Sequence, residues 1–317
     1  MVLVGKNILV TGGTGFIGSH LVERLIAEGS NVIVPYQSHN PKSYFFRTKL
    51  DKSVVLVQKD LKNFKRTSDV ITKYEIDYIF HLAAQSIVPT AYYNPLEALE
   101  TNIMGTANVL EAARLYGKVQ GIIVVSSDKA YGKIPQASEA DPLSGDHPYE
   151  TSKAAADLLA HTYFRTYHLP VAITRFGNVY GEGDINFSRI IPGIAKSIVK
   201  NELLILRSNG KFVRDYVYVK DVVGALILLM RNIKSIQGEA FNISSEENLS
   251  VLQLIKTIER RLMKEIKYRI ANKTYNEIPK QSINFQKIKT QLGWHPKANI
   301  NNTIVNILDW YRVFFGK

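Results

Sequence analysis

The chain has 317 residues, of which 45% are hydrophobic and 21% are charged, a composition typical of an ordinary globular protein. Its longest apolar run has nine residues, whereas a helix needs roughly 20 to cross a membrane. We therefore predict a protein without a membrane partner. Cysteine is absent, which excludes disulfides and thiolate chemistry, and no signal-peptide pattern precedes the first apolar run, which predicts a cytoplasmic location. The net charge of +12 would suit nucleic acid, but the lysines are scattered over many segments, so we predict a charged surface and no nucleic-acid partner.

Short apolar runs alternate with helical patterns over the first half of the chain. The runs lie at 8–10, 32–34, 54–57, 78–82, 121–126 and 171–175, and the main helical patterns lie at 19–28, 96–116 and 150–168. Strands that alternate with helices pair in parallel through right-handed crossovers. The sequence therefore predicts an α/β fold with a Rossmann-type, doubly wound parallel sheet and a ligand at the carboxyl ends of its strands.

A glycine-rich turn, TGGTGFIG at 11–18, joins the first predicted strand to the first predicted helix. Gly12 would permit the tight turn, Gly15 would let the backbone approach a ligand, and Gly18 would let the helix pack on the strand. Unpaired N–H groups at a helix start favour a phosphate. The spacing G-x-x-G-x-x-G differs from that of many dehydrogenases, and a plain connector is the alternative, but the strand–turn–helix context favours a nucleotide site.

Reactive side chains follow the fifth predicted strand in the segment SSDKAYG at 126–132. Ser127 could hydrogen-bond a substrate hydroxyl, and Asp128 with Lys129 could form an acid–base pair. The alternative is a turn stabilised by Asp and Ser with an exposed lysine.

Tyr149 and Lys153 lie one turn apart at the start of a predicted helix, so their side chains share one face. A nearby ammonium lowers the pKa of a phenol, which would make Tyr149 a usable general base. The alternative is an incidental pair on a helix surface, and the position after the Ser126-Ser127 strand end favours the catalytic interpretation.

The pattern changes after residue 175. A turn-rich segment at 176–184 precedes a helix at 190–200, a strand at 212–219, a helix at 221–230, a strand–helix unit from 239 and a final helix at 300–315. We predict a dinucleotide-binding domain over 1–175, rejoined by about 213–232, and a smaller α/β C-terminal domain over 176–317 that binds the substrate. The boundary is expected to be interleaved.

The seven histidines form no H-x-x-x-H or H-E-x-x-H pattern, so we predict no metal site. His81 ends a predicted buried strand, which favours a hydrogen-bonded core residue.

Seven motifs occur in order: TGGTGFIG at 11–18, HLAAQ at 81–85, SSDKAYG at 126–132, YETSK at 149–153, RFGNVYG at 175–181, RDYVYVKD at 214–221 and LGWHP at 292–296. Together, over nearly the whole chain, they resemble the extended short-chain dehydrogenase/reductase family. Within it the resemblance is to the nucleotide-sugar epimerases and dehydratases, and especially to proteins like CDP-glucose 4,6-dehydratase.

The resemblance implies NAD or NADP, tightly bound and recycled within each turnover, with NAD favoured. The cofactor contacts that it implies are Gly12, Thr14, Gly15, Phe16, Ile17, Gly18, Asp60, Leu61, Leu82, Ala83, Ala84, Asn102, Ser126, Tyr149, Lys153 and Phe176. The second predicted strand ends in VPYQS at 34–38, with neither an acid for a ribose 2′-hydroxyl nor an arginine for a 2′-phosphate, so the choice between the two cofactors stays open.

The resemblance also implies a nucleotide-diphosphate sugar as the partner of the 176–317 domain. The implied substrate contacts are Gln85, Ser86, Asn178, Asn186, Phe187, Arg189, Arg207 and Arg214. Arginine suits this role because its planar fork matches phosphate oxygens.

The resemblance implies a catalytic group of Tyr149, Lys153, Ser127, Asp128 and Lys129. Many sugar 4,6-dehydratases carry Thr-Asp-Glu where this chain carries Ser-Asp-Lys, a form similar to the CDP-glucose dehydratases, and epimerases typically place small or apolar residues there. We therefore predict a 4,6-dehydratase acting on CDP-glucose or a GDP, UDP or dTDP analogue. The alternatives are an NAD-dependent nucleotide-sugar 4-epimerase and a non-catalytic dinucleotide-binding regulator.

The predicted helices at 96–116 and 149–168 each have an apolar face. In the family that the motifs resemble, such helices pair across a two-fold axis in a four-helix bundle, which implies a homodimer.

Overall fold

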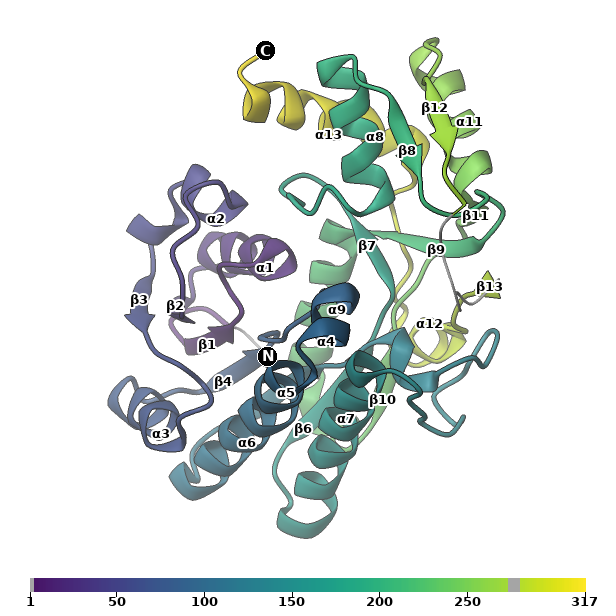
Figure 1. Cartoon of the computed structure of the whole chain (residues 1–317). Coiled ribbons are helices and arrows are strands. Elements are labelled where there is room, and N and C mark those ends of the chain that lie inside the picture. Colours follow the sequence, from purple (N-terminus) through teal and green to yellow (C-terminus); the bar gives the residue numbers. More distant parts are fainter. Residues whose placement is uncertain (1–2, 273–279) are drawn as a thin grey trace.

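A seven-stranded parallel sheet is the centre of the computed structural model, which describes residues 3–272 and 280–317 (Figure 1). Its strands are β1 (Asn7–Thr11), β2 (Asn31–Tyr36), β3 (Val55–Gln58), β4 (Tyr78–His81), β5 (Gly121–Val125), β6 (Val171–Arg175) and β10 (Ala240–Asn242). They lie in the order β10-β6-β5-β4-β1-β2-β3, and every neighbouring pair is parallel. The predicted doubly wound sheet is therefore confirmed.

Helices cover both faces of this sheet, because successive strand residues point to opposite sides and both sets are apolar. On β1, Ile8 and Val10 pack in one core cluster, whereas Leu9 between them packs in a second. The first face carries α1 (Phe16–Ala27), α9 (Val219–Arg231) and α10 (Ile233–Ile236), and the second carries α3 (Phe64–Lys73), α6 (Gly105–Tyr116) and α7 (Pro148–Tyr167). Within the described residues, no helix is both long and apolar enough to cross a membrane.

Short helical segments connect these elements. They are α2 (Tyr44–Arg47), α4 (Val88–Tyr93), α5 (Pro95–Leu99), the 3₁₀ turns η1 (Leu50–Lys52) and η3 (Asp128–Tyr131), and the π-helical turn η2 (Glu100–Met104). The helix predicted at 96–116 is therefore divided into α5, η2 and α6, because a π-helical turn interrupts the regular α-helix.

A smaller part of the molecule lies beyond the carboxyl ends of the large sheet (Figure 1). Its four-stranded sheet contains β7 (Asn178–Tyr180), β9 (Val213–Tyr218), β11 (Asn248–Ser250) and β13 (Lys280–Gln281), and a two-stranded sheet pairs β8 (Leu204–Leu206) with β12 (Tyr268–Ile270). The helices of this part are α8 (Ile190–Lys200), α11 (Val251–Leu262), α12 (Gln286–Leu292) and α13 (Ile300–Phe315).

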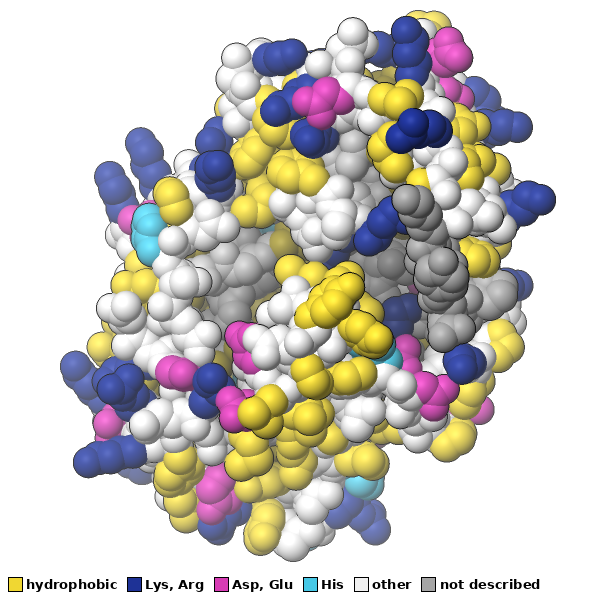
Figure 2. Space-filling model, in the orientation of Figure 1, with side chains coloured by type: hydrophobic (Ala, Val, Ile, Leu, Met, Phe, Trp, Pro, Cys, Tyr) yellow, Lys and Arg dark blue, Asp and Glu magenta, His cyan; other side chains and the backbone are white. Residues whose placement is uncertain are grey.

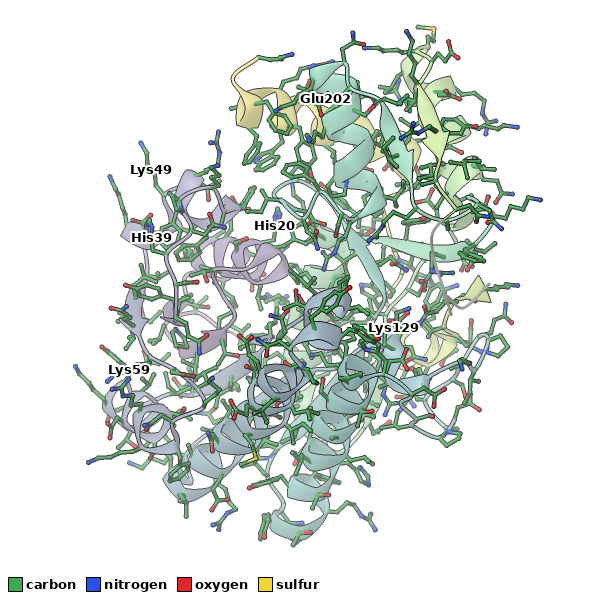
Figure 3. All side chains as sticks on the ribbon, viewed as in Figure 1. His20, His39, Lys49, Lys59, Lys129 and Glu202 are labelled. Carbon is green, nitrogen blue, oxygen red and sulfur yellow. The ribbon has the colours of Figure 1, made fainter. Side chains whose placement is uncertain are left out.

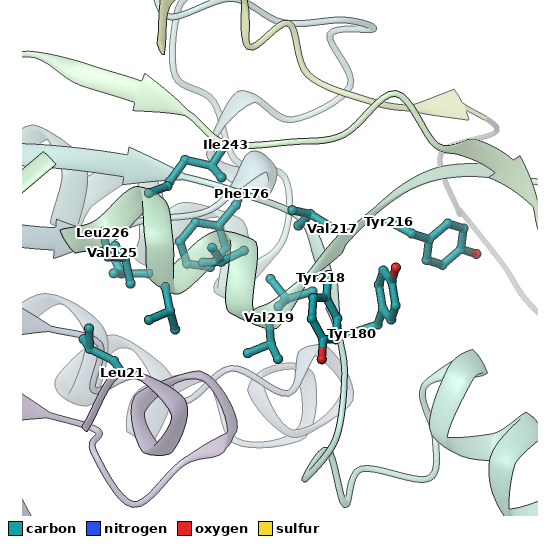
Figure 4. Close-up of a cluster of buried hydrophobic side chains, with 14 of the residues drawn as sticks. Leu21, Val125, Phe176, Tyr180, Tyr216, Val217, Tyr218, Val219, Leu226 and Ile243 are labelled. Carbon is teal, nitrogen blue, oxygen red and sulfur yellow. The ribbon is translucent and has the colours of Figure 1, made fainter. Parts of the chain in front are cut away.

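One apolar core runs through both parts. Figure 4 shows Leu21 and Val125 from the large-sheet side and Val217 and Tyr180 from the smaller sheet, on either side of α9. A continuous core holds the two parts in a fixed relation, so the space between them keeps its shape.

The segment expected to rejoin the large sheet, about 213–232, divides between the two parts of the structure. β9 belongs to the smaller sheet, whereas α9 packs against α1. The strand expected from residue 239 is β10, which pairs with β6, and its three residues are too few for their apolar pattern to indicate membership of the large sheet. The domain limits themselves stay a prediction.

A buried ion pair joins β6 to α7. Arg175 donates from Nε and Nη2 to the two carboxylate oxygens of Asp157 over 2.7 and 2.8 Å, and from Nη1 to the hydroxyl of Tyr131 over 2.7 Å. Tyr131 in turn donates to Asn242 Oδ1 on β10 over 2.8 Å. The group therefore connects four elements, β6, α7, η3 and β10.

Replacing Arg175 with leucine is expected to lower the free energy of unfolding by about 3–5 kcal/mol, because it leaves the buried carboxylate of Asp157 unpaired. Denaturant unfolding measures this change. Arg312→Leu is the matched control, since Arg312 pairs with Asp309 on the exposed side of α13 and should change stability by about 1 kcal/mol or less. Equal effects in the two variants would contradict the prediction.

Candidate functional site

A cavity of about 1400 Å³ opens where the carboxyl ends of the large sheet face the smaller part. The chain runs outward from β1 through β2 to β3 and then returns to β4 on the other side of β1, so the strand order reverses there. Such a switch point leaves a crevice in which α/β proteins bind ligands. The cavity therefore lies where the predicted sheet places its ligand.

The glycine turn forms one wall of this cavity. Gly12 has φ +70°, and a Cβ there would lie 2.8 Å from the backbone nitrogen of Ala83. A Cβ on Gly18 would lie 2.1 Å from the carbonyl oxygen of Gly12. Gly15 caps α1 without a side-chain hydrogen bond within the described structure, so the first N–H groups of the helix are available to a ligand. The turn thus fits a dinucleotide pyrophosphate.

Gly18→Ala is expected to raise the dissociation constant of NAD at least about tenfold, because its methyl group displaces either the turn or α1. Isothermal titration calorimetry measures this constant. Gly224→Ala on α9 is the control, because the described residues put no atom within 4 Å of a Cβ there. Unchanged NAD binding by the Gly18 variant would show that this turn does not hold the dinucleotide.

Beyond the turn, the cavity extends toward Asp60 and Leu61 after β3. Asp60 Oδ1 accepts a hydrogen bond from Gln37 Nε2 over 2.6 Å and one from the backbone nitrogen of Lys62 over 2.9 Å. Gln37 and Lys59, the latter labelled in Figure 3, line the same end. Neither residue was predicted to belong to the site, because neither lies in one of the seven motifs.

Asn102 holds the 82–86 segment through hydrogen bonds to the backbone of Gln85. Asn102 Oδ1 accepts from the backbone nitrogen of Gln85 over 2.7 Å, and its Nδ2 donates to the Gln85 carbonyl over 3.2 Å and to Ser152 Oγ over 2.8 Å. Ser152 lies on α7 between Tyr149 and Lys153. Asn102 and Gln85 do not line the cavity, and Asn102 supports the segment that forms its wall.

His81 is a hydrogen-bonded core residue, as predicted. Thr106 Oγ1 donates to the carbonyl of Asn102, so it accepts from His81 Nε2 over 2.9 Å, and His81 Nδ1 accepts from Thr11 Oγ1 over 2.8 Å. Burial lowers the pKa of His81 to about 3. His81 therefore stays neutral and links β1 and β4 to the helix that carries Asn102.

Tyr149 and Lys153 lie on the cavity wall at the start of α7. Burial raises the pKa of Tyr149 to about 12, while a hydrogen bond with Ser127 and the charge of Arg189 lower it. Lys153 Nζ donates to the carbonyl of Val125 over 2.8 Å, and burial lowers its pKa to about 8. We expected Lys153 to lower the pKa of the phenol; in the structure burial leaves that pKa raised, and the groups that lower it are Ser127 and Arg189.

The segment after β5 brings Ser127, Asp128 and Lys129 to the same wall. Ser127 Oγ donates to Asp128 Oδ1 over 3.0 Å and accepts from the backbone nitrogen of Lys129 over 3.2 Å. Lys129, labelled in Figure 3, lies between α7 and the strands of the smaller sheet. The predicted acid–base pair and the predicted phenol thus face one cavity.

The rest of the predicted site lies on the same surface. Cavity-lining residues from the cofactor prediction are Gly12, Thr14, Gly15, Phe16, Ile17, Gly18, Asp60, Leu61, Leu82, Ala83, Ala84, Ser126, Tyr149, Lys153 and Phe176. Those from the substrate prediction are Ser86, Asn178, Asn186, Phe187, Arg189, Arg207 and Arg214. Only Asn102 and Gln85 of the predicted contacts lie off the lining.

The substrate side carries three arginines. Arg189 pairs with Asp184 over 3.1 Å, Arg207 donates to the carbonyl of Ser188 over 3.0 Å, and Arg214 donates to its neighbour's carbonyl at 213 over 2.8 Å. Convergent guanidinium groups provide a site for a diphosphate. Tyr92 and Tyr93 also line the cavity.

One end of the cavity carries the glycine turn, which fits a dinucleotide, and the other end carries the arginines, which fit a diphosphate. This combination is typical of enzymes that oxidise or rearrange a nucleotide-linked substrate. The family model described as GDP-mannose 4,6 dehydratase matches residues 9–307, so the chain belongs to that family, and the predicted membership of the extended short-chain dehydrogenases/reductases is confirmed.

Three similar proteins illustrate the relationship. The chain is 27% identical over 330 residues to the CDP-glucose 4,6-dehydratase of Salmonella typhimurium, covering 98% of this chain and 91% of the relative. It is 29% identical to the crystal structure of a dTDP-glucose 4,6-dehydratase from Streptomyces venezuelae with NAD bound, at a TM-score of 0.87 and covering 98% of each chain. It is also 29% identical to a UDP-glucose 4-epimerase structure from Thermotoga maritima, at a TM-score of 0.87, covering 98% of this chain and 99% of the other.

Proposed function

We propose that the protein is a nucleotide-sugar 4,6-dehydratase that uses NAD. Its substrate would be CDP-glucose or a GDP, UDP or dTDP analogue, and its product the corresponding 4-keto-6-deoxy sugar. The observation that carries this proposal is that Asp128 and Lys129 line the same cavity as Tyr149, which provides an acid and a base in addition to the phenol. The similarity to dehydratases of CDP-glucose and dTDP-glucose supports it.

NAD fits the residues of the site. The cradle of Gly12, Gly15 and Gly18 would hold the pyrophosphate, and Lys153 would hold the nicotinamide ribose. The similar dehydratase from Streptomyces venezuelae contains NAD, which supports this cofactor over NADP. Held there, NAD would supply hydride-transfer chemistry, the oxidation at C4 and the reduction at C6.

The proton transfers of the reaction are carried out by side chains of this protein. Tyr149 accepts the proton of the C4 hydroxyl, with Ser127 hydrogen-bonded beside it. The resulting 4-keto group acidifies the C5 hydrogen, which Lys129, or water that it holds, removes. Asp128 protonates the C6 hydroxyl as it leaves as water. The buried walls keep these groups in fixed positions, which favours reaction of a correctly oriented hexose.

Arg189 and Arg214 would hold the diphosphate of the substrate, and Asn178 and Asn186 would contribute hydrogen bonds. Asn178 Nδ2 is buried without a hydrogen-bond partner among the described residues. A buried donor of this kind favours a ligand that accepts its hydrogen bond.

A labelling experiment tests the function. The purified protein is incubated with CDP-, GDP-, UDP- and dTDP-glucose carrying deuterium at C4, and the products are analysed by mass spectrometry and NMR. A dehydratase yields a product that has lost water and carries the deuterium at C6. Loss of water without deuterium at C6, or no 4-keto sugar from any substrate, would contradict the proposal.

A 4-epimerase is the second candidate, favoured by the similarity to the UDP-glucose 4-epimerase structure. It would use Tyr149, Lys153 and Ser127 in the same way but return the hydrogen to C4 from the other face. No elimination occurs in that reaction, so Asp128 and Lys129 would have no essential role. The same labelled substrates then give a 4-epimer that keeps its deuterium at C4.

We further propose a homodimer through α4 to α7. Figure 2 shows hydrophobic side chains gathered over these helices, and Leu96, Met104, Leu115, Leu158 and Tyr167 are each more than half exposed. Apolar surface of this kind favours association. Analytical ultracentrifugation at micromolar concentration should give twice the monomer mass, and Leu158→Lys should shift the species to the monomer. A wild-type monomer would contradict the proposal.

A further inference from the structure

A second buried carboxyl group lies behind Asp128. Asp215 on β9 is 2% exposed and Asp128 on η3 is 3% exposed. Among the described residues, neither Asp215 Oδ1 nor Asp128 Oδ2 has a hydrogen-bond partner. Buried polar atoms are normally paired, so two unpaired carboxylate oxygens in one region require an explanation.

Gly177 shows that these two oxygens border the same small space. A Cβ on Gly177 would lie 2.7 Å from Asp128 Oδ2 and 3.2 Å from Asp215 Oδ1. A side chain at this position would therefore crowd both carboxyl groups, and the two oxygens lie on either edge of the room that glycine leaves.

The other oxygen of each carboxyl group is held by a serine. Ser127 Oγ donates to Asp128 Oδ1 over 3.0 Å, and Ser244 Oγ donates to Asp215 Oδ2. The paired oxygens are thus directed toward the serines and the unpaired oxygens toward the space beside Gly177. Two other titratable groups lie beside the pair: Lys129, whose charged form would lower the pKa of Asp215, and Tyr149 next to Ser127.

Two carboxylates in such a space cannot both ionise at little cost. Burial and the neighbouring charge of Asp128 raise the pKa of Asp215 to about 6. The pair consequently keeps one proton at a pH where isolated carboxyl groups have lost theirs.

We propose that Asp128 and Asp215 hold one proton between them, and that this shared proton is the one that Asp128 gives to the departing C6 hydroxyl. The inference rests on the proposed dehydration. Asp215 is in this account a positioning residue, because it acts through Asp128 and does not itself line the cavity.

The protons balance through Ser127. Tyr149 takes the proton of the C4 hydroxyl, and the hydrogen bonds from Tyr149 to Ser127 and from Ser127 to Asp128 form a path to the carboxyl pair. The C6–O bond breaks with its electron pair on oxygen, which takes the pair's proton and leaves as water. Lys129 takes the C5 proton, offsetting the charge left on the carboxylates, and returns it to C5. The phenol's proton then restores the pair.

The first test observes the shared proton without any turnover. Infrared difference spectroscopy of the enzyme without substrate, titrated with acid, should show the carbonyl band of a neutral carboxylic acid appearing near pH 6 in the wild type. The band should be absent at that pH in Asp215→Asn. A wild type whose buried carboxyls all titrate in the ordinary range near pH 4 would overturn the inference.

The second test uses the pH profile of the reaction. Without Asp215 the shared proton is no longer held up to about pH 6, so the upper pH limit of kcat should move down by about one unit or more in Asp215→Asn, with KM unchanged. Gly177→Ala, whose methyl group would crowd both carboxyls and remove neither, should move it in the same direction. Asp221→Asn is the matched control, since Asp221 accepts hydrogen bonds from the backbone at 297 and 298, away from the cavity.

The outcomes separate this inference from the function on which it rests. Absence of product from the wild type with every nucleotide sugar would contradict the dehydratase proposal, whatever the infrared titration shows. A wild type that dehydrates its substrate, together with an Asp215→Asn profile that matches that of Asp221→Asn, would overturn the shared proton alone.

Discussion

Replacing Tyr149 with phenylalanine is expected to lower kcat for dehydration by a factor of about 10²–10⁴, the usual contribution of a general base. The phenol is 8% exposed, faces the cavity and makes a hydrogen bond with Ser127. Phenylalanine keeps the ring that packs against Ala91 and Ala98 but removes the oxygen. The variant should therefore bind its nucleotide sugar normally and fail to oxidise it.

Two measurements separate these effects. Isothermal titration calorimetry of the nucleotide sugar should give a dissociation constant close to that of the wild type, while the transfer of deuterium from C4 to C6 should slow with kcat. Tyr163→Phe provides the matched control, because Tyr163 lies on the same helix and donates to Glu111 outside the cavity. A Tyr149 variant that retained wild-type kcat would remove the phenol from the mechanism.

The sequence predicted the large sheet well because its strands are buried on both faces. Such strands are nearly continuous apolar runs, and six runs separated by helical patterns leave few topologies other than a doubly wound sheet. Membership of β10 in the large sheet was not predicted, because a strand of three residues is too short to show an apolar run. The π-helical turn at 100–104 was not predicted either, because the helical spacing of apolar residues continues through it.

The residues of the candidate site also fall into a group that the sequence predicted and a group that it did not. The residues in motifs, such as Ser127, Tyr149 and Gly18, lie on the cavity because strand ends and helix starts converge there. Asp215 was not assigned a role, because it lies within a strand pattern and its proximity to Asp128 depends on how β9 packs against η3. The partnership of Arg175 with Asp157 is equally a product of tertiary packing between β6 and α7.

Replacing Lys129 with alanine should separate dehydration from epimerisation. If Lys129 removes the C5 proton, elimination should fall by about 10²-fold or more, whereas oxidation at C4 continues. The variant should then accumulate the oxidised hexose that still carries its C6 hydroxyl, detected as reduced nicotinamide by absorbance. Exchange of the C5 hydrogen with deuterated water should also be lost.

The control and the opposite outcome decide between the two candidate functions. The control is Lys196→Ala. Lys196 lies outside the cavity lining and pairs with Glu202, which Figure 3 labels at the far end of the smaller part. This variant should match the wild type in every assay. A Lys129 variant that still interconverts C4 epimers at the wild-type rate would favour the epimerase, because rotation of a 4-keto sugar requires neither a base at C5 nor an acid at C6.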